Sequence, residues 1–505
     1  MTIDSKRIAK NTIFMYLRMI LVMGITIFTS RVVLDKLGVD DYGLYNAVAG
    51  VVGMLSFLNN TLSKGTSRFI TFEIGTGDGT SLKKTFSTAF YTHVFLMIIL
   101  LFFLETVGLW FLDNKLVIPD DRLYASRCVY QISLLTMCIG VIQVPFTSCI
   151  IAYEDMSLYA YLGIFEAVCK LIVAYLLIVA NVDKMILYAL LMLCIHLMVF
   201  LVYVLFCNKK YSEASYYKKF DSQIFRNILS FSGWNVIANL TETLKAQGSS
   251  VLVNIFFKPA LVAAQAVSNQ VTNILLNFVY QFTTALNPQI IKLYAEGERY
   301  ASKKLTLQST IFVFDLVLII CLPLIYVIEP ILYIWLVEVP ENTVNFIRIS
   351  LVTQIVNVFN ITFYTPMVAS GKLRSNSVWG VFLGLGQFAL AYILYRMGYD
   401  VLCLPYLLLI STCIYSFLVK PFVLYKEIDY KIKEMLLCYA DCFKVLLPSV
   451  ILTLGLNYII SPDSLIDYSI ISVGTILIIL IFAILGLNKE MRYRLFKIIR
   501  VKVLK

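Results

Sequence analysis

The stretch FSTAFYTHVFLMIILLFFLETVGLWFL, residues 86–112, holds a single acidic residue, Glu105, and no lysine or arginine. A bilayer core about 30 Å thick requires about 20 apolar residues in one helix. Inside it every backbone N–H and C=O must find its hydrogen-bond partner within the protein, which favours a helix over other local structures. The stretch is therefore predicted to cross a membrane as an α-helix.

Similar apolar runs fill nearly the whole chain on both sides of this stretch. Hydrophobic residues make up 60% of the sequence and charged residues 14%, whereas soluble domains have about 45–50% and about 25%. The fold class is therefore predicted to be an all-α polytopic membrane protein with about 14 transmembrane helices. The predicted spans are 8–34, 42–63, 86–112, 127–151, 161–180, 185–206, 228–257, 261–288, 305–328, 344–370, 377–395, 401–424, 445–460 and 468–487.

Charge is distributed unevenly between the two sides of this predicted topology. An even number of spans places both termini on the same side of the membrane. The segments on that side carry about 30 of the 42 Lys and Arg residues, so the positive-inside rule predicts that both termini are cytoplasmic. The same placement in short loops explains the net charge of +11 without nucleic acid as a partner. The 11 cysteines form no CxxC pair, so neither a zinc site nor a disulfide framework is indicated.

The two halves of the chain resemble each other at a shift of 219 residues. Ser30–Leu34 then falls on Ser249–Val253, and Asn46–Val48 falls on Gln265–Val267. Such a repeat predicts two six-helix lobes related by a pseudo-two-fold axis along the membrane normal, with the substrate site between them. The predicted domains are a lobe at 1–206, a lobe at 207–424, two added helices at 425–487 and a tail at 488–505.

Two basic stretches near the C-terminus are predicted to lie on the cytoplasmic membrane surface. Residues 488–505 alternate basic and apolar side chains, as an amphipathic surface helix does. Residues 428–443 are predicted to form a second surface helix between spans twelve and thirteen.

A short motif lies between the first and second spans. Residues 31–45, RVVLDKLGVDDYGLY, place a basic residue before the pattern LG-x-x-x-YG-x-Y. With Ser67-Arg68-Phe69 and residues 285–290, ALNPQI, the motif resembles the polysaccharide-biosynthesis flippases of the multidrug/oligosaccharidyl-lipid/polysaccharide (MOP) superfamily. The number of spans, the cytoplasmic termini and the two predicted lobes agree with this resemblance over the whole chain.

The resemblance implies a function in the bacterial inner membrane. It implies a flippase that moves polyprenyl-diphosphate-linked oligosaccharide from the cytoplasmic to the outer leaflet for O-antigen or capsule biosynthesis. The implied partners are this lipid-linked cargo, membrane lipids, a coupling H⁺ or Na⁺ and other polysaccharide assembly proteins. No cofactor is implied.

Charged residues within spans mark candidate sites, because each costs about 2.5–3.5 kcal/mol on insertion scales. Arg18 lies deep in the first span with no acidic residue three or four positions away, and suits a diphosphate group or a partner on another helix. Arg31 lies at the outer mouth, and Lys64 and Arg68 lie at the inner mouth. These three are predicted to guide phosphate or to anchor the helices at the interface.

Two pairs of opposite charge have helical spacing. Glu166 and Lys170 are four residues apart, and Glu242 and Lys245 are three apart, so each pair meets on one helix face. They are either internal ion pairs or cavity groups in which the lysines bind phosphate and the glutamates bind a coupling cation. Asp315 has no basic neighbour on its own helix, and is predicted either to bind H⁺ or Na⁺ or to stay protonated in a dry site.

Uncharged amides form a stripe on the predicted eighth span. Gln265, Asn269, Asn273 and Asn277 recur every four residues and so share one helix face. Asn357 and Asn360 repeat the theme on the tenth span. Amides both donate and accept hydrogen bonds, as sugar hydroxyls require, so the stripes are predicted to line a hydrated cavity and not only to link helices.

Two other classes of function compete with this prediction. A drug–cation antiporter of the same superfamily would need unpaired acidic groups and usually has twelve spans. A membrane-embedded glycan polymerase, ligase or acyltransferase would need a long catalytic loop or a His/Asp constellation, and the sequence offers only two histidines. No phosphate-binding loop or nucleophile motif occurs. The chain is therefore predicted not to be an enzyme.

Overall fold

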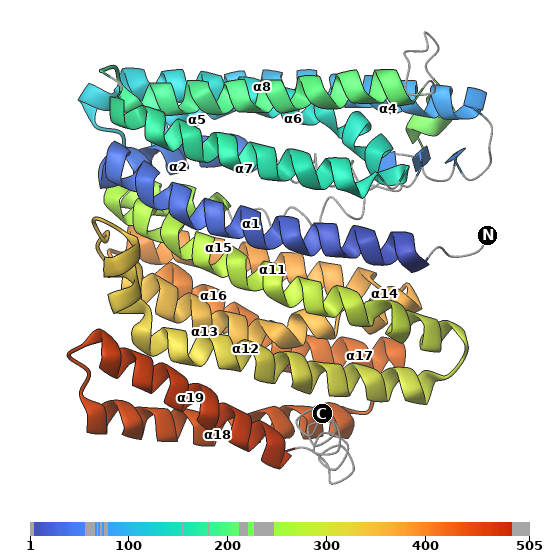
Figure 1. Cartoon of the computed structure of the whole chain (residues 1–505), viewed down its shortest axis with the longest axis vertical. Helices are drawn as coiled ribbons and strands as arrows, with labels where there is room; N and C mark the ends of the chain where they lie inside the picture. The colour runs from blue at the N-terminus through green and yellow to red at the C-terminus, as the bar shows by residue number, and fades with distance from the viewer. Residues whose placement is uncertain are drawn as a thin grey trace. The chain divides into compact units, whose positions relative to one another are not determined.

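The structure is a computed structural model that describes residues 5–55, 66–67, 69–70, 73–74, 79–153, 155–179, 181–211, 221–226 and 247–486 (Figure 1). Within these residues all the regular secondary structure is helical. Ten helices of the described chain are long and apolar enough to cross a membrane. The protein is therefore an all-α, multi-pass membrane protein, as its composition predicts.

The described helices follow the predicted spans closely, because long apolar runs fix where helices cross a bilayer. Residues 161–180 and 185–206, which are separated by only a few residues, form two distinct helices, as predicted. In the first half the elements are α1 (Ser5–Leu37), α2 (Val39–Gly53), α4 (Gly79–Phe103), η1 (Leu104–Gly108), α5 (Leu109–Lys115), η2 (Asp120–Arg122), α6 (Leu123–Ala152), α7 (Met156–Val179), α8 (Lys184–Lys210) and α10 (Ser249–Phe256).

The second half contains the two longest of the described helices, α11 and α12. Its elements are α11 (Pro259–Ala295), α12 (Arg299–Trp335), α13 (Thr343–Thr362), α14 (Thr365–Ser370), α15 (Arg374–Arg396), α16 (Cys403–Ile414), η4 (Tyr415–Val419), α17 (Lys420–Ile428), α18 (Ile432–Ile460) and α19 (Leu465–Gly486). Pro366 occupies the first turn of α14, where its missing N–H separates α14 from α13.

One predicted element differs from the structure. Residues 428–443 do not form a separate surface helix, because residues 432–443 are the first turns of the 29-residue helix α18. Met435, Cys438 and Cys442 in these turns are buried, so the apolar residues of this stretch pack into the protein and not only onto a membrane surface. The predicted tail helix at 488–505 lies outside the described residues.

Contacts divide the chain into two compact units. Unit 1 comprises residues 1–266, 335–341 and 392–401, and unit 2 comprises residues 267–334, 342–391 and 402–505. The lobe boundaries expected after residues 206, 424 and 487 stay a prediction.

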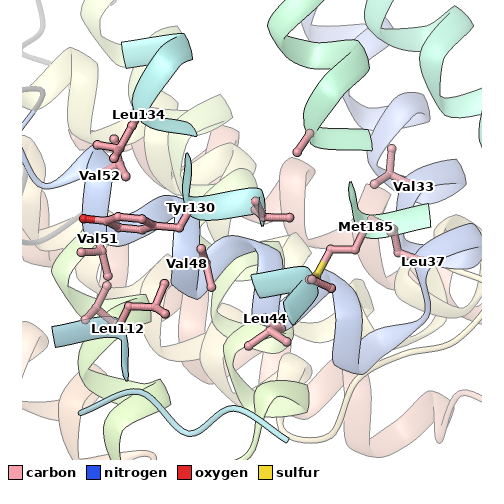
Figure 2. Packing of buried hydrophobic residues seen from close by; sticks show 14 of the residues in the cluster. Val33, Leu37, Leu44, Val48, Val51, Val52, Leu112, Tyr130, Leu134 and Met185 are labelled. Carbon is pink, nitrogen blue, oxygen red and sulfur yellow. The ribbon is translucent and has the colours of Figure 1, made fainter. Parts of the chain in front are cut away.

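The core of unit 1 is built around α2, which packs on α6 and against α10. Figure 2 shows the ring of Tyr130 among Val48, Val51 and Val52 of α2, with Leu134 one turn along α6. The Tyr130 hydroxyl donates a hydrogen bond to the carbonyl of Leu104 over 2.7 Å. An apolar ring with a satisfied hydroxyl fixes α6 against the short π-helix η1.

An aromatic cluster forms the corresponding core of unit 2. The ring of Phe359 in α13 contacts Phe314 of α12 at 5.4 Å and Tyr439 of α18 at 4.8 Å between centroids. Tyr439 donates a hydrogen bond to the carbonyl of Ser416 over 2.8 Å. These contacts hold α12, α13 and α18 around η4.

Candidate functional site

The amide stripe on α11 becomes more exposed along the helix. Gln265 is buried, Asn269 is half-buried, and Asn273 and Asn277 are exposed. The regular spacing of four residues places the four side chains on one side of α11. The last two therefore present amide groups at the surface of unit 2.

Three amides on α13 are joined by hydrogen bonds. Asn360 donates from Nδ2 to Oδ1 of Asn357 over 3.2 Å, and Asn357 donates to Oε1 of Gln354 over 3.1 Å. All three side chains are half-buried. Oδ1 of Asn360 is buried and has no partner among the described residues. The series therefore ends in an acceptor that is available for a hydroxyl group.

The helices that carry the two amide stripes are neighbours. The hydroxyl oxygens of Ser268 on α11 and Ser350 on α13 are 3.0 Å apart. Further along both segments, Thr365 of α14 donates to Oδ1 of Asn287 over 2.6 Å. Because both contacts advance along the chain together, α11 runs parallel to α13, and the stripes lie between the two contacts. We refer to Asn269, Asn273, Asn277, Gln354, Asn357 and Asn360 as the amide surface.

The amide surface offers hydrogen-bond donors and acceptors without net charge. Such groups match the hydroxyl and acetamido groups of sugars, which also donate and accept. Ser350 lies four residues before Gln354 and seven before Asn357, so it is on the same face of α13. Sequence reasoning found each stripe but had no means of placing one beside the other.

The charged pair in unit 1 is formed. Nζ of Lys170 lies 2.6 Å from Oε1 of Glu166 on α7, and both side chains are about one-third exposed. The charges of Lys170 and Glu166 both act electrostatically on His196 of α8. The spacing of four residues therefore produces an ion pair within α7, which is the first of the two interpretations that the sequence allowed. Its part in binding or coupling stays a prediction.

Asp315 on α12 lies beside α18. Its side chain interacts electrostatically with Cys442, and its Oδ1 is buried without a partner among the described residues. A second contact between the same helices is made by the thiol of Cys438 at 3.7 Å from the carbonyl of Leu307. A carboxyl oxygen with no partner in a buried position is costly, which is typical of functional groups in membrane spans.

The predicted basic residues are described to different extents. Arg31 is half-buried near the end of α1 and makes no ion pair with any described residue. Arg18 belongs to α1, but its side chain lies outside the described residues, as do Lys64, Arg68, Glu242 and Lys245.

The motif LG-x-x-x-YG-x-Y organises the packing of unit 1. Gly38 has φ 82°, a conformation that favours glycine. A Cβ at Gly43 would lie 1.8 Å from the carbonyl oxygen of Pro259, so α2 and the start of α11 approach too closely for any side chain. Tyr45 packs edge-on against Tyr188 of α8, with ring centroids 4.9 Å apart.

Sequence reasoning missed an ion-pair cluster in unit 1. Arg122 binds Asp41 of α2, and its Nη1 lies 2.6 Å from Oδ2 of Asp183. Asp183 also caps α8, because its Oδ1 accepts hydrogen bonds from the N–H groups of Met185 and Ile186. Arg122 therefore links α2, α6 and α8 at one end. No local signal reveals this, because Asp41 and Arg122 are 81 positions apart.

A buried lysine in unit 2 was also missed. Lys420 is only 1% exposed, and its Nζ donates to Oδ1 of Asn376 over 2.7 Å. The rings of Tyr364 and Tyr415 lie 5.5 Å and 5.2 Å from Nζ, within the range of cation–π contacts. The sequence alone treats Lys420 as one of many basic residues at a cytoplasmic helix end.

Solved structures share this arrangement of helices. A lipid II flippase MurJ in an inward closed conformation has a TM-score of 0.67 at 13% identity, over 94% of this chain and 98% of that one. A multidrug-resistance MATE-family transporter of the MOP superfamily, in an inward-facing conformation, has a TM-score of 0.63 at 13% identity, over 78% and 92% of the two chains. A MOP-superfamily transporter from Pyrococcus furiosus, whose description notes a binding pocket of reverse polarity, has a TM-score of 0.58 at 14% identity, over 81% and 94%.

The likeness to known proteins is found in the three-dimensional structure and not in the amino-acid sequence. No protein-family model and no curated protein matches the chain. Each of the three solved structures is described as a transporter or a flippase, and none as an enzyme. The chain therefore has the fold of the MOP-superfamily transporters.

Proposed function

We propose that this protein is a flippase that moves a polyprenyl-diphosphate-linked oligosaccharide from the cytoplasmic to the outer leaflet, for surface polysaccharide such as O-antigen or capsule. The observation that carries the proposal is the amide surface of α11 and α13. It supplies several uncharged hydrogen-bonding groups at membrane depth, which sugar hydroxyls require and which cationic drugs do not.

The exposure of this surface supports a hydrated cavity. An amide facing hydrocarbon without partners costs several kcal/mol, about 4–8 on the scale of transfer to cyclohexane. Asn273 and Asn277 are exposed, so they are favourable only where water or a polar substrate meets them. We infer that the amide surface lines the path of the sugars, while the lipid tail stays in the bilayer.

The diphosphate group of the cargo requires a binding site with positive charge. We assign this role to Arg18, Arg31, Lys170 and Lys245, with Lys64 and Arg68 at the cytoplasmic entrance. Arg31 supports the assignment, because among the described residues it has no acidic partner to neutralise it. An arginine fork is well suited to phosphate, since it donates two parallel hydrogen bonds.

Transport against a gradient requires an energy source. We propose that Glu166, Glu242 and Asp315 take up a coupling H⁺ or Na⁺, or that the membrane potential acts on the charged cargo. The potential is worth about 2.3 kcal/mol per elementary charge for each 100 mV. Asp315 is the strongest candidate of the three, because its Oδ1 lacks a partner among the described residues.

The first experiment is mass spectrometry of polyprenyl-linked lipids from cells that lack this protein. We expect diphosphate-linked oligosaccharide to accumulate on the cytoplasmic side, with loss of the matching surface glycan. Unchanged lipid-linked sugars together with new sensitivity to cationic dyes would instead indicate a drug–cation antiporter. Accumulation on the outer leaflet would indicate a membrane enzyme acting after the flippase.

A second experiment tests the amide surface itself. The double variant Asn273→Leu with Asn277→Leu removes two exposed hydrogen-bonding groups and should lower glycan export about tenfold or more. The matched control is Asn345→Leu, which replaces an asparagine at the start of α13, outside the amide surface. Equal export by the two variants, at equal protein levels, would contradict the proposal.

A further inference from the structure

Unit 1 contains a partly open cavity of about 270 Å³ lined by residues of α2, α4, α6 and α8. Eleven of its 15 lining residues are apolar or glycine, among them Met137 and Met192. A cavity of this volume is large enough to hold a small organic molecule. It lies in unit 1 and shares no residue with the amide surface.

Four polar side chains line the cavity, namely Tyr45, Ser133, Thr136 and His196. Thr136 donates to the carbonyl of Ile132 over 2.9 Å, and the ring of Tyr45 packs on Tyr188. Ser133 and His196 make no hydrogen bond with any residue that the structure describes. An apolar cavity with a few available polar groups is the usual form of a small-molecule site.

The dimensions select a small ligand. Ala189 and His196 both line the cavity from α8, so the cavity extends about 10 Å along that helix at 1.5 Å per residue. An apolar cavity of about 150 Å³ accommodates benzene, so about 270 Å³ accommodates roughly ten to eleven non-hydrogen atoms. Drug-sized molecules generally occupy about 300–1,000 Å³. The lipid-linked oligosaccharide is far too large to enter.

The charges around the cavity select an uncharged ligand. Glu166 and Lys170 neutralise each other across 2.6 Å while both act on His196. Within the described part of unit 1, no charged side chain lines the cavity itself. A charged molecule would lose its hydration there without gaining a counter-ion.

We propose that this cavity binds a small, uncharged amphipathic molecule, such as an aromatic alcohol of about ten non-hydrogen atoms. Its hydroxyl group exchanges hydrogen bonds with His196 and Ser133. Its apolar body lies against Met137, Met192 and Leu100, where the flexible thioethers adapt to its shape. The proposal does not rest on the proposed transport function, because none of the residues that line the cavity is assigned to cargo binding or ion coupling.

The test is equilibrium dialysis of 1-naphthol and naphthalene against the full-length protein in lipid nanodiscs, with empty nanodiscs of the same lipid as the reference. The two probes share a ring system, and only 1-naphthol has a hydroxyl group. We expect saturable 1-naphthol binding above the empty discs. His196→Phe should weaken 1-naphthol binding about five- to tenfold and leave naphthalene binding unchanged.

A pair of glycine variants tests the location. Gly140 lines the cavity, and no atom lies within 4 Å of the position that a Cβ would take there, so Gly140→Leu fills the cavity and should abolish binding. Gly386 on α15 is equally open but lies in unit 2, so Gly386→Leu should bind 1-naphthol normally. Met192→Trp fills the same space from α8 and replaces Gly140→Leu if that variant fails to fold.

Three results would overturn the proposal. Binding equal to that of empty discs would mean simple partition into lipid. Normal binding by the filled variants would place the ligand elsewhere. Equal affinity for 1-naphthol and naphthalene, with no effect of His196→Phe, would show that the ligand hydroxyl makes no hydrogen bond with His196. The double variant Asn273→Leu with Asn277→Leu should bind 1-naphthol normally, which separates this test from that of the proposed transport function.

Discussion

At the scale of single residues, the requirement for glycine at position 43 is steric. The space that a Cβ would need is occupied by the backbone of Pro259, which cannot rotate away as a side chain would. Gly38 differs, because its positive φ, and not lack of space, favours glycine there. The two glycines of one short motif therefore have different physical causes.

Gly43→Ala should lower the free energy of unfolding by about 1–3 kcal/mol, because α2 must move away from the start of α11 to make room. The matched control is Gly24→Ala on α1, where no atom lies within 4 Å of the new Cβ. Thermal unfolding of the purified variants in detergent measures the difference. Equal midpoints for the two variants would show that α2 and α11 are not in this close contact.

Asp315 is the residue at which coupling is most directly testable. Asp315→Asn keeps the shape of the side chain but removes the group that could take up H⁺ or Na⁺. We expect loss of ion-gradient stimulation of glycolipid transport in proteoliposomes, with glycolipid binding retained. Asp441→Asn on α18 is the control, because Asp441 already pairs with Lys444 at 2.7 Å. Full stimulation in Asp315→Asn would exclude this carboxyl as the coupling group.

At the scale of secondary-structure elements, Arg122 acts as a link between helices. It joins Asp41 in the first turn of α2 to Asp183, the N-cap of α8, from the start of α6. Asp41 is only 8% exposed, so it depends on this partner for compensation of its charge. Helices that share only apolar surfaces can slide, whereas this link fixes their relative register.

Arg122→Gln should destabilise the protein by about 1–3 kcal/mol, and more so at higher pH. Burial raises the pKa of Asp41 and outweighs the lowering by Arg122. A carboxyl with a raised pKa in the folded state favours folding when protonated, so its contribution declines as pH rises above about 4. Removing Arg122 raises this pKa further and extends the decline to higher pH.

The measurement is unfolding of Arg122→Gln between pH 4 and pH 8. Adding Asp41→Asn to this variant should abolish the additional pH dependence, because no titrating group then remains at position 41. If the single and the double variants have the same pH profile, Asp41 is not the responsible group.

At the scale of the whole molecule, the topology follows from the distribution of charge. An even number of spans and about 30 of 42 basic residues on one side predict cytoplasmic termini. The connection at Val182 between α7 and α8 is then external, and the connection at Gly297 between α11 and α12 is internal. Val182 is 62% exposed, so a fused reporter is accessible there.

Alkaline phosphatase should be active when fused after Val182 and inactive when fused after Gly297, because the enzyme needs the oxidising outer side. Green fluorescent protein fused at the two positions should give the opposite result. The reverse pattern for both reporters would invert the proposed direction of transport.

The sequence alone was sufficient to predict most of the fold. Apolar runs of about 20 residues must be helices in a bilayer, so the positions of the spans and the depth of each polar residue follow from local composition. Contacts within one helix are similarly local, and Glu166 and Lys170 meet as their spacing of four residues requires. Residues 428–443 were misassigned because a basic amphipathic pattern is the same at the start of a span and on a membrane surface.

Contacts between helices were decided only by the tertiary structure. The helices α11 and α13, which carry the two amide stripes, are neighbours because Ser268 meets Ser350 and Asn287 meets Thr365. The link from Arg122 to Asp41 and the cavity beside His196 depend in the same way on which helices pack together. The physical reason is that a bilayer imposes helical structure on each segment separately, whereas side-chain shape and hydrogen bonding between distant segments select the neighbours of each helix.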